Sequence, residues 1–420
     1  MEQIKNLKAG IKYKETPVGK IPVDWDLVRL GDICDVIGGS TPSTNRKEFW
    51  GGDIPFATPT DITKLDGREI EDTDQRITPE GLSSCGTNLL PVGTILLTSR
   101  ATLGACAINK KPMATNQGFA NLVCKERAYN WFVFYKMASL KNELQKLGSG
   151  STFKEVSKKS IKGIAFSLPP LTEQKKIAEI LSTVDEAIEK TDQIIEKTKE
   201  IKKGLMQKLL TQGIGHKKFK KTEIGEIPLE WEVGKISDYG EIVTGNTPPT
   251  SNPNYYGNEY PFVSPFDLGD KKTIFQAKKY LSNDGFLVSR NLPANAVLVV
   301  CIGSTIGKTG IAGTNLATNQ QINSIICKDN DYNFVYYYVT FISQKFKQLA
   351  GTQAVPILNK GNFSVVEVAI PPRGEQKRIG EILSSGDEEI EEETKHKDQL
   401  ESLKKGLMQV LLTGKIRVNV

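Results

Sequence analysis

Two stretches of the chain carry apolar side chains at alternating steps of four and three residues, the spacing of a coiled-coil helix. The first stretch follows Pro170 and the second follows Pro372, while Gly213 and Gly414 mark their ends. Neither apolar stripe is wide enough for burial in a globule. We therefore expect two rods of roughly 60 Å that pack on each other in antiparallel orientation and hold two globular domains apart. The stripes are Ile177, Leu181, Val184, Ile188, Thr191, Ile195 and Thr198, and, weaker and more polar, Ile379, Leu383, Gly386, Ile390, Glu393, Lys397 and Leu400.

Residues 14–168 and 220–370 mix short apolar runs with glycine- and proline-rich turns, a pattern typical of β-strands. Each segment also contains an aromatic-rich stretch at helical spacing. We interpret each stretch as one amphipathic helix with a buried face, and stacking of its rings on nucleic-acid bases is the alternative. The expected strands include 32–37, 94–98, 241–243 and 296–301, and the expected helices are 130–147 and 333–349.

One pattern occurs twice, about 200 residues apart. Gly-x-Ile-Pro-x-x-Trp begins at Gly19 and Gly225, Ala-Thr-Asn-Gln begins at Ala114 and Ala317, and PPLTEQKKIAEILS in the first copy corresponds to PPRGEQKRIGEILS in the second. Two units of this size are not a solenoid, which needs at least three short repeats. We predict an α+β fold of two homologous globular domains separated by two long antiparallel coiled-coil helices, with pseudo-twofold symmetry. The predicted boundaries are 1–168, 169–212 for the first helix, 213–370 with a short linker, and 371–420 for the second helix and C-terminal tail.

Composition narrows the function class. Hydrophobic residues make up 38% and charged residues 25% of the chain, and no apolar run approaches the roughly 20 residues of a membrane span. The N-terminal sequence MEQIKNLKAG lacks the apolar core of a secretion signal. Six cysteines without a CxxC pair, and only two histidines, argue against a metal site. We expect a cytoplasmic protein without a membrane segment, metal or cofactor.

The net charge of +6 is unevenly placed. The helical segment 171–210 contributes 0 and the segment 373–412 contributes −3, so the rest of the chain carries +9. Basic globular parts are expected if these parts bind phosphates, although a modestly basic surface is also common in proteins that bind no nucleic acid.

Motifs for catalysis or nucleotide binding fail on spacing. The segment Gly303–Thr309 resembles a P-loop, but three residues separate its glycines where the phosphate loop needs four. No GxGxxG follows a predicted strand, and both histidines, His216 and His396, lie outside the globular segments, which excludes a Ser/His/Asp or Cys/His set there. The sequence predicts a binding protein without catalytic residues.

The chain consists of a globular unit, a PP-x-x-EQK helix, a second globular unit and a second PP-x-x-EQK helix, with Gly-x-Ile-Pro-x-x-Trp near the start of each unit. This order resembles that of the specificity subunit of type I restriction–modification systems. The resemblance covers nearly the whole chain. It implies target recognition domains that each bind one half of a bipartite double-stranded DNA target, and spacer helices that bind two modification (methyltransferase) subunits. It also implies that S-adenosylmethionine, ATP hydrolysis and cleavage belong to the modification and restriction (ATP-dependent nuclease and translocase) subunits.

Segments 64–75 and 270–276, and likewise 152–162 and 353–363, differ between the copies, whereas the frame agrees. Different loops on a shared frame predict an asymmetric target, and neutral drift of surface loops explains the same difference. The Asn–Gln amides could contact adenine, but their identity in both copies favours a role in folding or phosphate contact. Basic side chains could hold the DNA backbone. The candidate DNA-binding residues are Thr41, Arg100, Asn116, Gln117, Lys154, Lys158 and Lys159 in the first copy, and Thr247, Lys271, Lys272, Lys278, Lys308, Asn319 and Gln320 in the second.

The helical stripes supply the candidate partner-binding residues, since they are amphipathic yet too polar to be sealed by each other alone. These residues are Leu181, Ile188, Ile195, Leu383, Ile390 and Leu400. Two other classes compete with this interpretation: a scaffold that joins two modules without touching DNA, and a fused enzyme subunit. A DNA affinity that falls steeply with salt would indicate a specificity subunit and not a scaffold. Turnover by the isolated chain would indicate a fused enzyme subunit.

Overall fold

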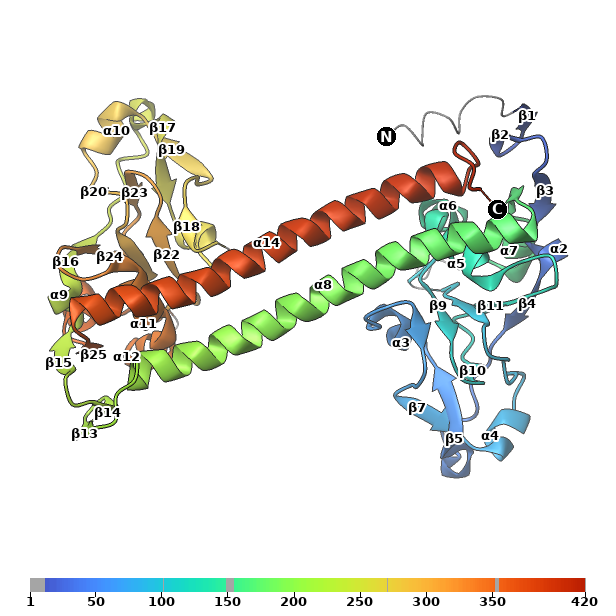
Figure 1. Cartoon of the computed structure of the whole chain (residues 1–420), viewed down its shortest axis with the longest axis horizontal. Coiled ribbons are helices and arrows are strands. Elements are labelled where there is room, and N and C mark those ends of the chain that lie inside the picture. Colours follow the sequence, from blue (N-terminus) through green and yellow to red (C-terminus); the bar gives the residue numbers. More distant parts are fainter. Residues whose placement is uncertain (1–11, 101, 149–154, 270, 352–354, 420) are drawn as a thin grey trace. The chain divides into compact units, whose positions relative to one another are not determined.

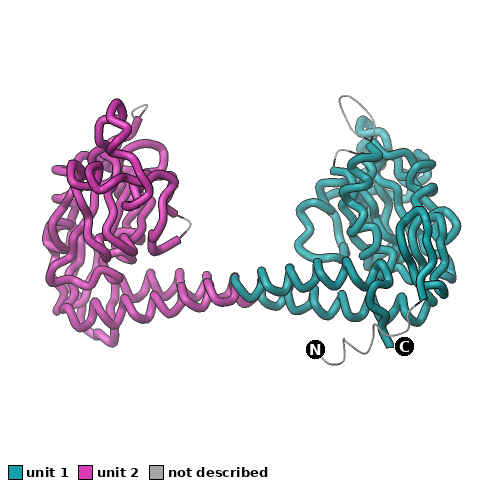
Figure 2. The backbone as a smooth tube through the Cα atoms, turned by 90° about the horizontal axis from the view of Figure 1, so that it is seen from above, with its two compact units in different colours: residues 1–192, 395–420 teal, residues 193–394 magenta. Residues whose placement is uncertain are grey.

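The computed structural model describes the chain except residues 1–11, 101, 149–154, 270, 352–354 and 420. It contains two compact units (Figure 2). Unit 1 comprises residues 1–192 and 395–420, and unit 2 comprises residues 193–394. Each unit combines strands and short helices with part of both long helices.

Unit 1 is organised around a five-stranded sheet of order β4-β11-β8-β9-β6, in which β6 and β9 are parallel and the other pairs are antiparallel. A second sheet of order β10-β5-β7 and the pairs β1-β2 and β3-β12 complete the unit. The strands are β1 Tyr13–Thr16, β2 Gly19–Pro22, β3 Asp26–Arg29, β4 Cys34–Gly38, β5 Trp50–Ala57, β6 Glu69–Ile70, β7 Gln75–Ile77, β8 Ile95–Leu97, β9 Cys106–Asn109, β10 Ala114–Thr115, β11 Ala120–Cys124 and β12 Ala165–Leu168.

Unit 2 repeats this topology. Its five-stranded sheet has the order β16-β24-β21-β22-β18, again with one parallel pair, β18 and β22, at the edge. A four-stranded sheet of order β19-β17-β23-β20 and the pairs β13-β14 and β15-β25 correspond to the smaller sheets of unit 1. The strands are β13 Phe219–Thr222, β14 Gly225–Pro228, β15 Glu232–Lys235, β16 Gly240–Thr244, β17 Tyr256–Val263, β18 Thr273–Ile274, β19 Lys279–Leu281, β20 Asn291–Leu292, β21 Val297–Val300, β22 Thr309–Ala312, β23 Leu316–Thr318, β24 Ile322–Cys327 and β25 Glu367–Ile370.

The predicted aromatic helices each consist of two helices. The chain breaks at Leu140 and Ile342, where ψ is 10° in both units. The aromatic side chains of α5 and α11 are largely buried, as expected for a core face. The short helices are α2 Leu30–Ile33, α3 Pro59–Thr63, α4 Pro79–Ser83, α5 Asn130–Ser139, α6 Lys141–Leu147 and α7 Lys158–Lys162 in unit 1, and α9 Ile236–Tyr239, α10 Asn283–Leu287, α11 Tyr332–Phe341, α12 Ser343–Leu349 and α13 Lys360–Ser364 in unit 2, with 3-10 turns η1 Lys47–Phe49, η2 Pro253–Tyr255 and η3 Pro265–Asp267.

The two long helices are α8 Leu171–Gln212 and α14 Arg373–Leu411 (Figure 1). The 42 residues of α8 correspond to roughly 60 Å. The helix α8 ends directly before Gly213, as predicted, whereas α14 ends at Leu411, three residues before Gly414. Both glycines have a positive φ, +64° and +69°, which side chains disfavour. In unit 1, Asp185 pairs with Lys404 and Asp192 pairs with Lys397, so the helices are antiparallel there.

The start of each long helix is part of a globular core. Ile177 and Leu181 of α8 pack in the core of unit 1 together with Trp25 and Leu411. In unit 2 the equivalent cluster contains Ile379 and Leu383 of α14 with Trp231 and the end of α8. Fully burying a leucine or isoleucine side chain stabilises by roughly 1.5–3 kcal/mol, so the first turns of each long helix are held to the core of a unit.

Candidate nucleic-acid interface and helix junctions

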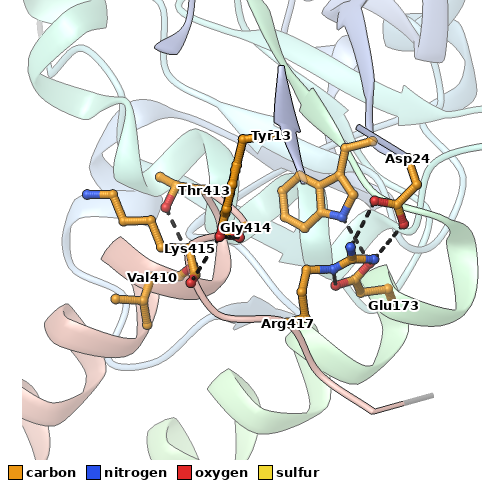
Figure 3. A network of polar contacts seen from close by, with 9 residues as sticks. Tyr13, Asp24, Glu173, Val410, Thr413, Gly414, Lys415 and Arg417 are labelled. Atoms are coloured by element: carbon orange, nitrogen blue, oxygen red, sulfur yellow. Dashed lines mark hydrogen bonds and ion pairs between the residues drawn. The ribbon is translucent and has the colours of Figure 1, made fainter. Parts of the chain in front are cut away.

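A tryptophan fixes the start of α8 in unit 1. The indole Nε1 of Trp25 donates to Glu173 Oε2 at 2.9 Å, and Glu173 is 1% exposed. Arg417, from the C-terminal tail, donates to both Glu173 and Asp24 (Figure 3). This guanidinium lowers the pKa of the Asp24 carboxyl. The paired Trp motifs of the sequence therefore anchor each unit to the first turn of a long helix.

Unit 2 builds the same junction with a different cation. Trp231 Nε1 donates to Glu375 Oε2 at 2.9 Å, and the Nε2 atom of His216 lies 2.9 Å from Glu375 Oε1. His216 Nδ1 also lies 2.8 Å from Glu230. Desolvation lowers the pKa of His216, but the two carboxylates outweigh it and the net shift is upward. His216 occupies the position of Arg417 in the repeat, so the cation of one junction is a titratable imidazole with a raised pKa, and that of the other is a guanidinium.

A second junction lies deeper along the helices in unit 1. Asp185 of α8, whose side chain is 6% exposed, accepts a hydrogen bond from Tyr135 Oη at 2.6 Å. Lys404 of α14 lies 2.5 Å and Arg68 lies 3.6 Å from the same carboxylate. Arg68 precedes β6, so this cluster ties the 64–75 loop to both long helices. Burial raises the pKa of Tyr135, and its hydrogen bond to the Asp185 carboxylate raises it further.

Unit 2 repeats this cluster, and it corrects one DNA-binding prediction. The Nζ atom of Lys272 donates to Tyr337 Oη at 3.0 Å and to Ser384 Oγ of α14 at 2.7 Å. Tyr337 donates to Asp387, which also pairs with Lys202 of α8. Burial lowers the pKa of Lys272. Because its amine is occupied inside the junction, Lys272 braces the loop and we no longer propose it as a phosphate contact.

The amide residues of the repeated Ala-Thr-Asn-Gln have two roles. Asn116 Oδ1 accepts from the backbone N–H of Gly118 at 2.8 Å, and Asn319 Oδ1 accepts from that of Gln321 at 3.1 Å, so both asparagines shape a turn. The glutamines are more accessible. Thr41 Oγ1 donates to Gln117 Oε1 at 2.5 Å, and Thr247 Oγ1 donates to Gln320 Oε1 at 2.8 Å, which brings the four predicted residues together as two equivalent surface pairs.

The basic candidates lie in different settings. Arg100 forms an ion pair with Glu155 at 3.0 Å. Its equivalent residue in unit 2 is Ile302 and not Lys308, because Arg100 and Ile302 form corresponding β-bridges in the two units. Lys308 is half-buried and donates to the backbone carbonyl of Leu268 at 3.0 Å. The candidates with exposed side chains are Lys158, Lys159, Lys271 and Lys278, and Lys154 lies outside the described residues.

Three of the six helical stripe residues proposed for partner binding are buried inside the chain. Leu181 and Leu383 are fully buried in their own cores, and Ile195 is 6% exposed, so these three predictions are wrong. Ile188, Ile390 and Leu400 are half-buried. The most accessible apolar side chains on the long helices are Ile201 of α8, which is 63% exposed, and Leu403 of α14, which is 50% exposed.

Ile201 and Leu403 occupy equivalent positions, each directly before the repeated Lys-Lys-Gly-Leu-Met-Gln, with one in each unit. Sequence reasoning missed them because both lie outside the stripe that it followed. Their recurrence in both copies was the available signal.

A sequence model described as the type I restriction modification DNA specificity domain matches residues 22–200 and again residues 228–402. The chain belongs to this family. The MjaIX specificity subunit of Methanocaldococcus jannaschii is 30% identical over 431 residues, 97% of each chain. The putative MjaX specificity subunit of the same organism is 32% identical over 434 residues, also 97% of each.

A crystal structure of a type I restriction–modification S subunit from M. genitalium has the same fold. Its TM-score is 0.60 at 12% identity, over 99% of this chain and 98% of that one. The two matches to the specificity domain coincide with the two repeats, so the resemblance inferred from the paired motifs is confirmed, together with the mixed α and β fold. Among the helices that the structure describes, none is both long and apolar enough to cross a membrane.

Proposed function

We propose that this chain is the DNA-binding specificity subunit of a type I restriction–modification complex, in which each unit binds one half of a bipartite, asymmetric target. Family membership supports DNA target recognition. The observation that carries the finer proposal is that the two units share one frame, including the Thr–Gln pairs, while their exposed loops differ. A shared frame places both loop sets alike, and different side chains then select different base pairs.

Methylation, ATP hydrolysis and cleavage are assigned in this proposal to partner subunits, two of them methyltransferases. The repeat supports two equivalent docking positions. Ile201 and Leu403 present exposed apolar side chains at equivalent positions of the two copies on the long helices, whereas Leu181 and Leu383 are buried. An exposed apolar side chain that is surrounded by charged residues suits the centre of a protein interface, where a partner would bury it.

Salt dependence of DNA affinity tests the proposal against the scaffold alternative. Neutralising three or more phosphates predicts that log K falls with log salt at a slope of about −3 or steeper. The assembled complex with its methyltransferase subunits is titrated with duplex DNA between low and high salt. An absence of DNA affinity at every salt concentration would favour the scaffold. The isolated chain incubated with S-adenosylmethionine and DNA is expected to show no turnover, and measurable methylation would identify an enzyme.

A further inference from the structure

The turn after β5 in unit 1 and the turn after β17 in unit 2 have the same backbone scaffold. In unit 1, the backbone N and Oγ1 of Thr58 both donate to Asp61 Oδ2, at 2.7 and 2.6 Å. In unit 2, the backbone N and Oγ of Ser264 donate to Asp267 Oδ2, at 2.8 and 2.7 Å. A proline follows Thr58 and Ser264 in both turns, so the two turns share one backbone geometry although their tips carry different side chains.

The second carboxylate oxygen extends this scaffold to the next loop. Asp61 Oδ1 accepts from the backbone N of Asp74 at 3.1 Å, and Asp267 Oδ1 accepts from the backbone N of Lys278 at 2.9 Å. Residues 74 and 278 therefore occupy equivalent places beside equivalent turns. Their side chains have opposite charge, although their backbones are held by the same bond.

The tips of the two turns also differ. Unit 1 carries Thr60, and unit 2 carries Phe266, which is 71% exposed. The Nζ atom of Lys278 lies 3.4 Å from the centre of that ring, a cation–π contact that restrains both side chains. A phenylalanine this exposed contributes little to the fold of unit 2, and its rigid setting beside a cation suits contact with a polyanion.

A cleft of about 500 Å³ adjoins the ring in unit 2, lined by Ser264, Pro265, Phe266, Thr305, Lys308 and Gln321. The bond from Lys308 to Leu268 O braces its edge. The repeat places Ala105 and Gly118 of unit 1 where unit 2 has Lys308 and Gln321.

Unit 1 has no room for a side chain at the position of Gln321. A Cβ atom on Gly118 would come within 2.8 Å of Pro59 Cγ. Unit 1 therefore lacks both side chains that line the cleft of unit 2 at these two positions, Lys308 and Gln321.

We propose that Phe266, on the turn braced by Lys308, and Lys278, on the loop beside it, determine part of the base sequence that unit 2 accepts. The phenylalanine ring contacts the 5-methyl group of a thymine in the major groove, the apolar group that this groove presents, and the lysine supplies positive charge beside it. Thr60 and Asp74 give unit 1 a different preference from the same scaffold. This inference rests on the proposed function and names the residues that carry it in unit 2.

The test exchanges the tips within the complete complex and maps the methylated sequence. Phe266→Thr combined with Lys278→Asp, the residues of unit 1, is expected to change the half-site of unit 2 at one or two positions and to leave the other half intact. Val233→Thr, which removes an exposed apolar group from β15, is the matched control and is expected to leave both halves unchanged.

A second measurement targets the methyl group directly. With wild-type complex, replacing the contacted thymine by uracil is expected to lower affinity about four-fold, the value of one buried methyl group. Phe266→Thr is expected to abolish this difference. Any of three results would overturn the inference: a half-site without thymine, an equal affinity for thymine and uracil at every position, or an unchanged half-site in the double variant. A complex without salt-dependent DNA affinity would overturn the proposed function as well, so the two failures are distinguishable.

Discussion

Removing the Asp185 carboxylate is expected to destabilise unit 1 far more than removing a similar carboxylate on the same helix. Asp185 is 6% exposed and is shared by Tyr135 at 2.6 Å and Lys404 at 2.5 Å, with Arg68 at 3.6 Å. In Asp185→Ala, the phenol loses its acceptor and two cations lose a buried counter-charge. Breaking a buried ion pair from one side costs about 3–5 kcal/mol.

The expected value lies at the lower end of that range. Arg68 keeps its second partner, Glu189, at 3.1 Å, and the side chain of Lys404 is 30% exposed and can turn toward water. We expect a loss of about 3 kcal/mol, which corresponds to roughly a hundred-fold change in the unfolding equilibrium. Asp192→Ala is the control, because Asp192 pairs with Lys397 at 2.6 Å but is 32% exposed. An exposed pair of this kind is worth at most about 1 kcal/mol.

Native-state hydrogen exchange measures both variants without a separate reporter. The slowest amides of β8, β9 and β11 exchange through unfolding of unit 1, so their protection reports its stability. Asp185→Ala is expected to lower this protection roughly a hundred-fold, and Asp192→Ala less than about five-fold. Equal losses in the two variants would refute the reasoning that burial of the shared carboxylate gives the junction its strength.

Three further predictions follow from the junctions and the helices. The pKa of His216 is raised above its ordinary value by Glu375 and Glu230, so its protonated form stabilises unit 2 below about pH 6.5 and that contribution is lost as the pH rises through the raised pKa. In hydrogen-exchange measurements, His216→Arg should remove this pH dependence of stability, and an unaltered pH profile would contradict the prediction. Ile201→Asp with Leu403→Asp should weaken assembly with methyltransferase subunits while both units stay folded; normal assembly by size-exclusion chromatography would rule out this surface. Inserting four residues after residue 198 lengthens α8 by about 6 Å and rotates its end by about 40°; methylation mapping should show a gap between half-sites larger by about one or two base pairs, and an unchanged gap at full activity would show that the helices do not set the spacing.

The features predicted from the sequence are those that depend on local chemistry. Gly213 and Gly414 lie at or just past the ends of the long helices, as expected, because both adopt a positive φ that other residues disfavour. Repeated motifs likewise identified the tandem units and the family. Trp25 and Trp231 stood out in the sequence, but their shared purpose, a hydrogen bond to the first turn of a long helix, depends on residues 144 and 148 positions away.

The predictions that failed depended on tertiary packing. Leu181 and Leu383 belong to a coiled-coil stripe by spacing, yet each packs in the core cluster of its own unit at the start of a long helix. Lys272 looked like a free cation because its partners, Tyr337 and Ser384, are distant in sequence. Phe266 attracted no attention, since an aromatic residue in a turn is expected in the core until its exposure is known.

Methylation mapping of a complex with one exchanged unit tests the central claim most directly. Residues 14–168 are replaced by the equivalent unit of a relative, and the chain is assembled with its modification subunits. If each unit binds its own half-site, one half of the methylated sequence changes to that of the donor and the other half stays the same. A change spread over both halves, or none in either, would contradict the account.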